Sequence, residues 1–289
     1  VHRRQRQMCI RDSAYGDATV LAEAEATSDS PQIICWVQIP DQATIKRLPK
    51  GCVVIGQVFA QRHPEQVEAL CEQEISCLAL ELVPRITRAQ SMDVLSSQAT
   101  VAGYQAVLMA ADLSPRLFPM LTTAAGTLRP AQVVVIGAGV AGLQAIATAR
   151  RLGAQVTAYD IRPAAREQVE SLGAKMIDTG VNAEGEGGYA RELSEEEKAQ
   201  QAEVLAQYLS RSDVVISTAA LPGRPAPKII TETMVQGMQA GSVVLDMAAE
   251  SGGNCVLTRV GETYTAENGV VIAGPLNLAS RAALHASEM

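Results

Sequence analysis

A glycine-rich turn between an apolar run and an alanine-rich helical pattern constrains this chain more than any other feature. The apolar residues 132–136 are followed directly by Gly137-Ala138-Gly139-Val140-Ala141-Gly142. In such a turn Gly137 permits a tight bend, Gly139 lets a pyrophosphate approach the backbone, and Gly142 lets the helix pack closely on the strand. The free N–H groups at the start of the helix favour phosphate. The pattern therefore predicts a dinucleotide-binding βαβ unit, although a glycine turn without a ligand is the alternative.

An acidic residue stands at the end of the next expected strand. Asp160 follows the strand-like run 155–159, 23 positions after Gly137. A carboxylate at this place accepts hydrogen bonds from the adenosine ribose hydroxyls and repels a 2′-phosphate, which favours NAD over NADP. Arg162, two positions further on, is a residue type that accommodates such a phosphate, so the residues alone leave NADP open. We expect NAD(H).

Runs rich in β-forming residues alternate with helical patterns along the chain. Strands are expected at 33–39, 52–59, 76–82, 132–136, 155–159, 174–177, 214–217, 242–246 and 270–273. Helices are expected at 64–73, up to about 113, up to about 152, and at 164–172, 195–210 and 230–238. This alternation predicts an α/β protein with two Rossmann-like domains, each a doubly wound parallel sheet.

The expected domains are an N-terminal α/β domain at 13–114, which we interpret as incomplete, and a nucleotide-binding domain at 115–289 with a truncated end. Pro115, Pro119 and the stretch 122–130 interrupt the pattern, and we interpret them as the crossing between domains. Residues 1–12 are basic and differ from the acidic, alanine-rich remainder. We interpret them as a non-native leader, with a disordered basic tail as the alternative.

Composition excludes several classes of protein. The net charge of -7 argues against nucleic-acid binding, which needs a basic face. Hydrophobic residues make up 47% of the chain but aromatic residues only 3%, so the core must be mainly aliphatic. No apolar run approaches the roughly 20 residues that cross a bilayer. The six cysteines form no CxxC pair, and we expect reduced, mostly buried thiols and no metal site.

Several further motifs carry a family resemblance. They are Pro84 to Ser97 (PRITRAQSMDVLSS), Ala102-Gly103-Tyr104, Gly187-Gly188-Tyr189-Ala190, Pro222 to Pro227 (PGRPAP) and Gly252-Gly253-Asn254-Cys255. With the glycine-rich turn, they resemble, in order, the NAD(H)-binding domain of the alpha subunit of proton-translocating NAD(P) transhydrogenases. The resemblance extends from about residue 13 to the last residue, and it implies the following site.

The first motif is expected to surround the nicotinamide, with Gln90 reaching toward a partner domain that carries NADP. The catalytic residues implied are Arg85, Gln90, Asp93 and Ser96, and Ile86 and Thr87 add cofactor contacts. Around the pyrophosphate and adenosine ribose the resemblance implies Gly137, Gly139, Val140, Gly142, Asp160, Ile161 and Arg162. It also implies a mobile loop with Gly188 and Tyr189, and a contact at Ala220, where relatives often have leucine. The segment 276–281 departs from the family pattern, so its contact is in doubt.

By this resemblance the chain transfers hydride between its NADH and NADP(H) on a partner domain, coupled to proton movement in a membrane subunit. It implies a homodimer in the cytoplasm, peripheral to the inner membrane through its partner subunits. An ordinary dehydrogenase would need a general base near the nicotinamide. The stretch 80–85, where the related alanine dehydrogenases carry a histidine, has none, and only Glu250 matches their substrate-site aspartate.

Two functional alternatives remain: an amino-acid dehydrogenase of the alanine type and a non-catalytic NAD-binding module. Residue by residue, simpler interpretations also stand. Arg85, Arg88 and Asp93 are compatible with an exposed charged loop, and the loop around Tyr189 with a linker. Glu250 and Asn254 are compatible with turn caps.

Overall fold

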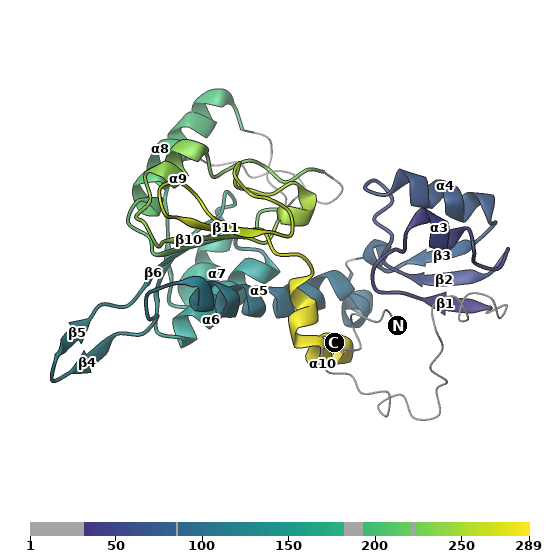
Figure 1. Cartoon of the computed structure of the whole chain (residues 1–289), viewed down its shortest axis with the longest axis horizontal. Helices are drawn as coiled ribbons and strands as arrows, with labels where there is room; N and C mark the ends of the chain where they lie inside the picture. Colours follow the sequence, from purple (N-terminus) through teal and green to yellow (C-terminus); the bar gives the residue numbers. More distant parts are fainter. Residues whose placement is uncertain (1–31, 85, 182–192, 221–223) are drawn as a thin grey trace. The chain divides into compact units, whose positions relative to one another are not determined.

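The computed structural model describes residues 32–84, 86–181, 193–220 and 224–289 (Figure 1). The chain divides into two compact units. The first contains Val1–Gln98 and Ala283–Met289, and the second is the continuous segment Ala99–Ala282. The long helix α5 (Val94–Leu113) begins in the first unit and continues into the second.

The first unit contains a three-stranded parallel sheet in the order β1-β2-β3. Its strands are β1 (Ile33–Cys35), β2 (Val53–Gly56) and β3 (Ser76–Ala79). Its helices are α3 (Gln42–Ile45), α4 (Pro64–Glu72), the 3-10 turns η2 (Leu80–Leu82) and η3 (Thr87–Met92), and the terminal α10 (Ala283–Glu288). The carboxylate of Asp41 accepts the Thr44 N–H at 2.7 Å and starts α3, and Pro64 occupies the first turn of α4, where its missing N–H costs nothing.

The second unit is built on a seven-stranded sheet in the order β11-β12-β10-β9-β6-β7-β8. All neighbouring strands are parallel except β11 with β12. The strands are β6 (Gln132–Ile136), β7 (Gln155–Tyr159), β8 (Lys175–Met176), β9 (Val214–Ser217), β10 (Val243–Asp246), β11 (Thr263–Thr265) and β12 (Val271–Ala273). The helices after α5 are α6 (Val140–Arg151), α7 (Ala165–Ser171), α8 (Glu195–Leu209), α9 (Glu232–Gln236), η5 (Ala249–Ser251) and η6 (Leu278–Ala282).

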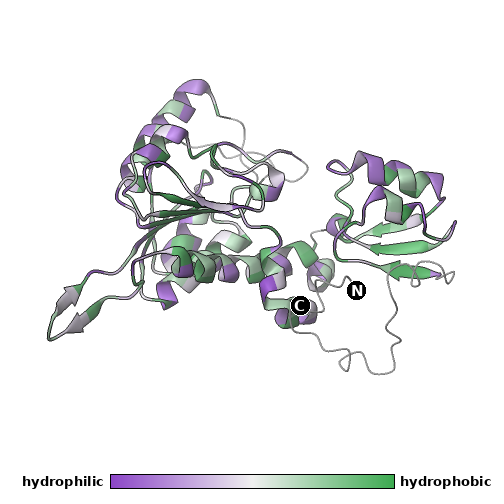
Figure 2. Ribbon diagram, viewed as in Figure 1, coloured by the Kyte–Doolittle hydropathy of each residue, from purple (hydrophilic) through white to green (hydrophobic). Residues whose placement is uncertain are grey.

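Helices cover both faces of this sheet, and two aliphatic cores result. Along β6, Val133 and Val135 join one core, whereas Val134 and Ile136 join the other. The first core is completed by α5, α6 and α7, and the second by α8 and α9 (Figure 1). Hydrophobic residues therefore colour the strands, and hydrophilic residues gather on outer helix faces (Figure 2). Burial on both faces explains the continuous apolar runs in the sequence.

The expected α/β class is confirmed, but some local expectations were wrong. The stretch 122–130, interpreted as a crossing, forms the hairpin of β4 (Leu121–Thr123) and β5 (Gly126–Leu128) within the second unit. Strand β3 ends at Ala79, three residues early, because a 3-10 turn follows. The antiparallel strand β11 was not anticipated.

The expectation of mostly buried cysteines was also wrong. Cys52 and Cys255 are buried, but Cys35, Cys71 and Cys77 are exposed. All five are free thiols. Cys35 and Cys77 lie in strands of a small sheet whose outer positions remain open, so an apolar sequence neighbourhood did not place them in the core.

Candidate functional site

The glycine-rich turn connects β6 to α6 at the carboxyl edge of the sheet, and each glycine has a distinct reason. Gly137 has a φ of +94°, which favours glycine, and a Cβ there would lie 2.6 Å from the Thr218 hydroxyl. A Cβ on Gly142 would collide with the carbonyl oxygen of Gly137. A Cβ on Gly139 would meet no atom within 4 Å. Open space at Gly139, before a helix without a side-chain cap, is what a phosphate group requires.

This contrast gives a first testable result. Gly142→Ala should cost about 1–3 kcal/mol of stability, because backbone must move to admit the methyl group. Gly139→Ala should leave the melting temperature within about 2 °C of the parent, since its methyl group enters open space. Thermal melting of both variants checks the stability difference, and equal melting temperatures would contradict it. NADH titration should show weaker binding for Gly139→Ala, because the methyl group fills the phosphate position.

Asp160 follows β7 and faces the turn. Its two oxygens accept hydrogen bonds from the Ala138 N–H at 2.7 Å and from the Arg162 backbone N–H at 2.9 Å. The Arg162 guanidinium adds two more, both at 2.9 Å. Burial opposes ionisation of Asp160, but the Arg162 guanidinium and these backbone donors together hold its pKa below the ordinary value. Asp160 is therefore an anion at neutral pH.

These four donors use the acceptor positions that a carboxylate offers. The sequence suggested Arg162 as a group that could receive a 2′-phosphate, but in the structure its guanidinium is bound to Asp160. A ribose hydroxyl can approach Asp160 only where Arg162 gives up some of this pairing. Beside Asp160, a hollow of about 220 Å³ is lined by Tyr159, Asp160, Ile161, Pro163, Arg166 and 176–181.

The loop after β9 forms the other side of the crevice. Thr218 donates a hydrogen bond to the Gly137 carbonyl at 3.0 Å and so binds this loop to the turn. The Asn254 side chain accepts the Ala219 N–H at 3.0 Å and donates to the Ala219 carbonyl at 2.7 Å. Ala220, the next residue, is exposed at the edge. Sequence reasoning assigned no role to Thr218, and its only signal is a hydroxyl residue directly after an apolar strand.

In the first unit, the expected nicotinamide loop spans η3 and the start of α5. Ile86, Thr87 and Gln90 are exposed, while Ala89 is buried and anchors the turn. Asp93 accepts hydrogen bonds from the Ser96 N–H at 3.0 Å and the Ser96 hydroxyl at 2.7 Å. In this structure the pair therefore caps the start of α5. Arg85, Gly188 and Tyr189 lie outside the described residues.

A residue that sequence reasoning missed steadies the same unit. Glu81 accepts the N–H groups of Val58 at 3.1 Å and Phe59 at 2.6 Å. Phe59 has a φ of +47°, which is uncommon for a bulky residue, so this carboxylate holds a strained turn at the carboxyl end of β2. Glu81 stood inside an apolar run, and a carboxylate there was the available signal.

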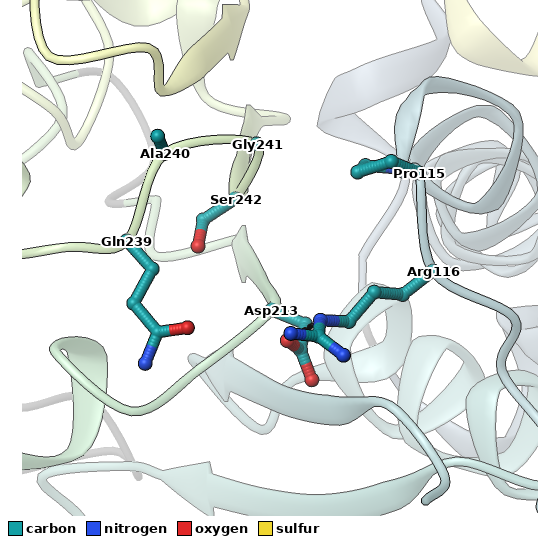
Figure 3. A pocket seen from close by; sticks show the side chains of 7 residues that line it. All are labelled: Pro115, Arg116, Asp213, Gln239, Ala240, Gly241 and Ser242. Atoms are coloured by element: carbon teal, nitrogen blue, oxygen red, sulfur yellow. Dashed lines mark ion pairs between the residues drawn. The ribbon is translucent and has the colours of Figure 1, made fainter. Parts of the chain in front are cut away.

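A larger hollow, of about 300 Å³, lies at the opposite edge of the seven-stranded sheet (Figure 3). It is lined by Pro115, Arg116, Asp213 and residues 239–242. Its polar centre is Asp213, which pairs with Arg116 at 2.7 Å and with Arg129 at 2.7 Å. Because both arginines are engaged by this buried carboxylate, we assign the cluster a structural role rather than a ligand-binding one.

The two units and the glycine-rich edge define a two-domain α/β protein of the doubly wound, dinucleotide-binding class. Two family models match consecutive segments of the chain: the N-terminal domain of alanine dehydrogenase/PNT over residues 3–102, and its C-terminal domain over residues 106–289. The chain belongs to the alanine dehydrogenase/PNT family.

Individual relatives agree with this assignment. The chain is 46% identical over 281 residues to the first of the separate NAD(P) transhydrogenase alpha-subunit chains of Rhodospirillum rubrum, covering 94% of this chain and 73% of the relative. It is 40% identical to the NAD(P) transhydrogenase subunit alpha of Haemophilus influenzae, covering 97% of this chain and 55% of the relative. The expected resemblance to transhydrogenase alpha subunits is thus confirmed.

Solved structures give the same result. A transhydrogenase structure from Sinorhizobium meliloti matches with a TM-score of 0.83 and 45% identity, covering 96% of this chain and 77% of that one. An L-alanine dehydrogenase structure matches with a TM-score of 0.75 at 22% identity, covering 96% of this chain and 72% of that one, and shows a shared fold. Within the described ranges, no helix combines the length and apolarity of a membrane span.

Proposed function

We propose that this chain is the NAD(H)-binding component of a proton-translocating transhydrogenase. In this proposal its bound NADH exchanges hydride directly with NADP held by a partner subunit. The observation that carries the proposal is the open phosphate position at Gly139 beside an ionised Asp160, in a chain 40–46% identical to transhydrogenase alpha subunits.

The residues present fit NAD(H). The helix α6 starts at Val140 without a side-chain cap, so its N–H groups are available to the pyrophosphate. Asp160 suits the adenosine ribose and disfavours a 2′-phosphate. When bound, the nicotinamide supplies or accepts the hydride. The chain's own contribution is then to hold the ring, orient it and exclude water.

The histidines fit a role without acid–base chemistry. His63 precedes α4, and His285 lies exposed in α10. Neither follows a strand of the seven-stranded sheet. Hydride exchange between two nicotinamide rings needs no proton transfer to a substrate, so no general base is required. An alanine-type dehydrogenase would require one.

The proposal implies partners. The NADP(H)-binding and membrane-spanning subunits of the enzyme would contact this chain, with the exposed Gln90 directed at the NADP(H)-binding subunit. The chain would then lie in the cytoplasm, peripheral to the inner membrane. Proton coupling would belong to the membrane subunit.

A mixing experiment tests this function. The protein is combined with a purified NADP(H)-binding transhydrogenase component, and reduction of an NAD analogue by NADPH is followed. We expect transfer only when both proteins are present, and slower transfer with Gln90→Asn. NADH binding without transfer would leave a binding module. Oxidation of NADH with pyruvate and ammonia would instead establish the alanine-type dehydrogenase.

We further propose that the chain forms a homodimer through the β4–β5 hairpin, which projects from the second unit (Figure 1). Every residue of both strands is exposed, and residues 117–128 include no charged residue in a chain of net charge -7. Exposed strand edges are usually protected by charges, and an isolated hairpin is marginally stable in water. The same edge on a second copy would satisfy the unpaired backbone groups symmetrically.

Placing lysines on the hairpin tests the dimer. The double change Thr122→Lys and Thr127→Lys should weaken dimerisation at least tenfold, about 1.4 kcal/mol, by charge repulsion between copies. Light scattering after size exclusion measures the mass at several concentrations. The matched control, Thr233→Lys in α9, should leave the mass unchanged. An unaltered dimer in the hairpin variant would contradict the proposal.

A further inference from the structure

A buried carboxylate lies at the carboxyl end of β10, outside the set of residues predicted to bind the cofactor. Asp246 is fully buried, and four neutral groups donate hydrogen bonds to it. Its Oδ1 accepts from the Ser217 hydroxyl and the Ala248 N–H, both at 3.0 Å. Its Oδ2 accepts from the Cys255 N–H at 3.0 Å and the Thr258 hydroxyl at 2.6 Å. Only an acceptor with two oxygens can receive all four donors.

These bonds fix the path of the loop after β10. Ala248 begins the loop, while Cys255 and Thr258 lie in its returning half, so one carboxylate gathers both ends. Gly253 passes so close that a Cβ there would lie 2.7 Å from the Asp246 Oδ2. The loop is therefore folded around this anion, and a side chain at position 253 would disturb it.

The loop in turn delivers Asn254, which is fully buried. Besides its two bonds to Ala219, the Asn254 amide donates to the Pro227 carbonyl at 2.9 Å. The Ala219 backbone is thereby held on both its N–H and its carbonyl. Since Cys255 N–H is bound to Asp246, the carboxylate sets the position of the neighbouring asparagine and, through it, of Ala219.

The position of Ala219 matters because of the strand order. Strand β6, which leads into the glycine-rich turn, lies between β7 and β9. Asp160, after β7, is on the side that receives the adenosine ribose. The loop of Ala219 and Ala220, after β9, is on the other side of the turn, where the remaining half of a dinucleotide must run.

We propose that Asp246 is a positioning residue for the nicotinamide half of the cofactor. It acts through Asn254, which fixes the Ala219–Ala220 backbone at the height that this half of NAD(H) requires. The inference rests on the proposed NAD(H) binding and adds to it a division of labour: Asp160 serves the adenosine half, and Asp246 serves the nicotinamide half at a distance.

The test compares NADH with 5′-AMP, which contains only the adenosine half. Asp246→Asn should weaken NADH binding about tenfold or more, because an amide NH₂ would face hydrogen-bond donors and displace the loop. Binding of 5′-AMP should change less than about twofold. NADH fluorescence and calorimetry with 5′-AMP give the two affinities. Equal weakening of both ligands, or of neither, would overturn the proposal.

Two further variants keep the test decisive where Asp246→Asn does not fold. Thr258→Val removes one donor, and Asn254→Ala removes the clamp on Ala219; both should weaken NADH more than 5′-AMP. Where the double variant of Asp246 and Asn254 can be purified, its NADH affinity should match the weaker single variant, because both changes act on one loop. Additive losses would show that Asp246 does not act through Asn254.

Asp213→Asn is the matched control, because it changes a buried carboxylate at the opposite edge of the same sheet. It should lower stability without altering the ratio of NADH to 5′-AMP affinity. A failure of NAD(H) binding altogether differs from a failure of this inference, since the parent protein would then bind neither ligand.

Discussion

Replacing Asp160 with asparagine is expected to weaken NADH binding by about ten- to a hundredfold. The loss corresponds to removing charged hydrogen bonds to the ribose hydroxyls, each of which contributes roughly 1.5–3 kcal/mol. The change also frees the Arg162 guanidinium from its pairing with Asp160. Binding of NADPH should therefore improve relative to NADH, because an arginine near this position accommodates a 2′-phosphate.

Titrations of the parent and the Asp160→Asn variant with NADH and NADPH measure this shift. Asp178→Asn is the matched control, because Asp178 is an exposed carboxylate in the neighbouring loop that pairs with Arg166 at 3.3 Å. The control should bind NADH like the parent. An unchanged ratio of NADH to NADPH affinity in Asp160→Asn would contradict the assigned role.

Replacing Asp213 with asparagine should lower the free energy of unfolding by about 2–3 kcal/mol, because the charged hydrogen bonds to Arg116 and Arg129 are lost. These arginines precede and follow the hairpin, and the carboxylate also accepts the Gln132 N–H at 2.8 Å at the start of β6. One side chain thus joins β9, β6 and both ends of the β4–β5 segment.

This stabilisation should depend on pH. Burial opposes ionisation of Asp213, but the hydrogen-bonded Arg129, the Gln132 N–H and nearby Arg116 hold its pKa below the ordinary value of 3.8. Because the folded protein has the lower pKa, the contribution is fully present above the unfolded pKa and is lost as pH falls through the folded one. The stability difference between parent and Asp213→Asn should therefore be constant from pH 6 to pH 5 and shrink below about pH 4.

Urea unfolding at several pH values measures this difference. Asp178→Asn, whose ion pair is exposed, should change stability by less than about 0.5 kcal/mol throughout. A difference between parent and Asp213→Asn that grew on acidification would contradict the sign.

The second unit was largely predictable from sequence, because its chemistry is local. The apolar run, three glycines and Asp160 follow one another within 29 residues (132 to 160), and each constrains its neighbours. Parallel strands buried on both faces also leave a continuous apolar signal, and β9 was placed at the bounds observed.

Contacts between distant residues could not be predicted in the same way. Asp246 meets Ser217, 29 positions earlier, and Asn254 meets Ala219, 35 positions earlier. Nothing in the local pattern of either residue names its partner, because the pairing depends on strand order. The β4–β5 hairpin was missed since its prolines and small residues indicate a loop as readily as a turn.

Isotope tracing tests the central claim most directly. NADH carrying deuterium at the transferable C4 position is mixed with this protein, the NADP(H)-binding component and NADP⁺, and the NADPH formed is analysed by mass spectrometry. Direct transfer predicts NADPH heavier by one deuterium, with no label in the water. Unlabelled NADPH, or label released into solvent, would contradict direct hydride exchange between the two nucleotides.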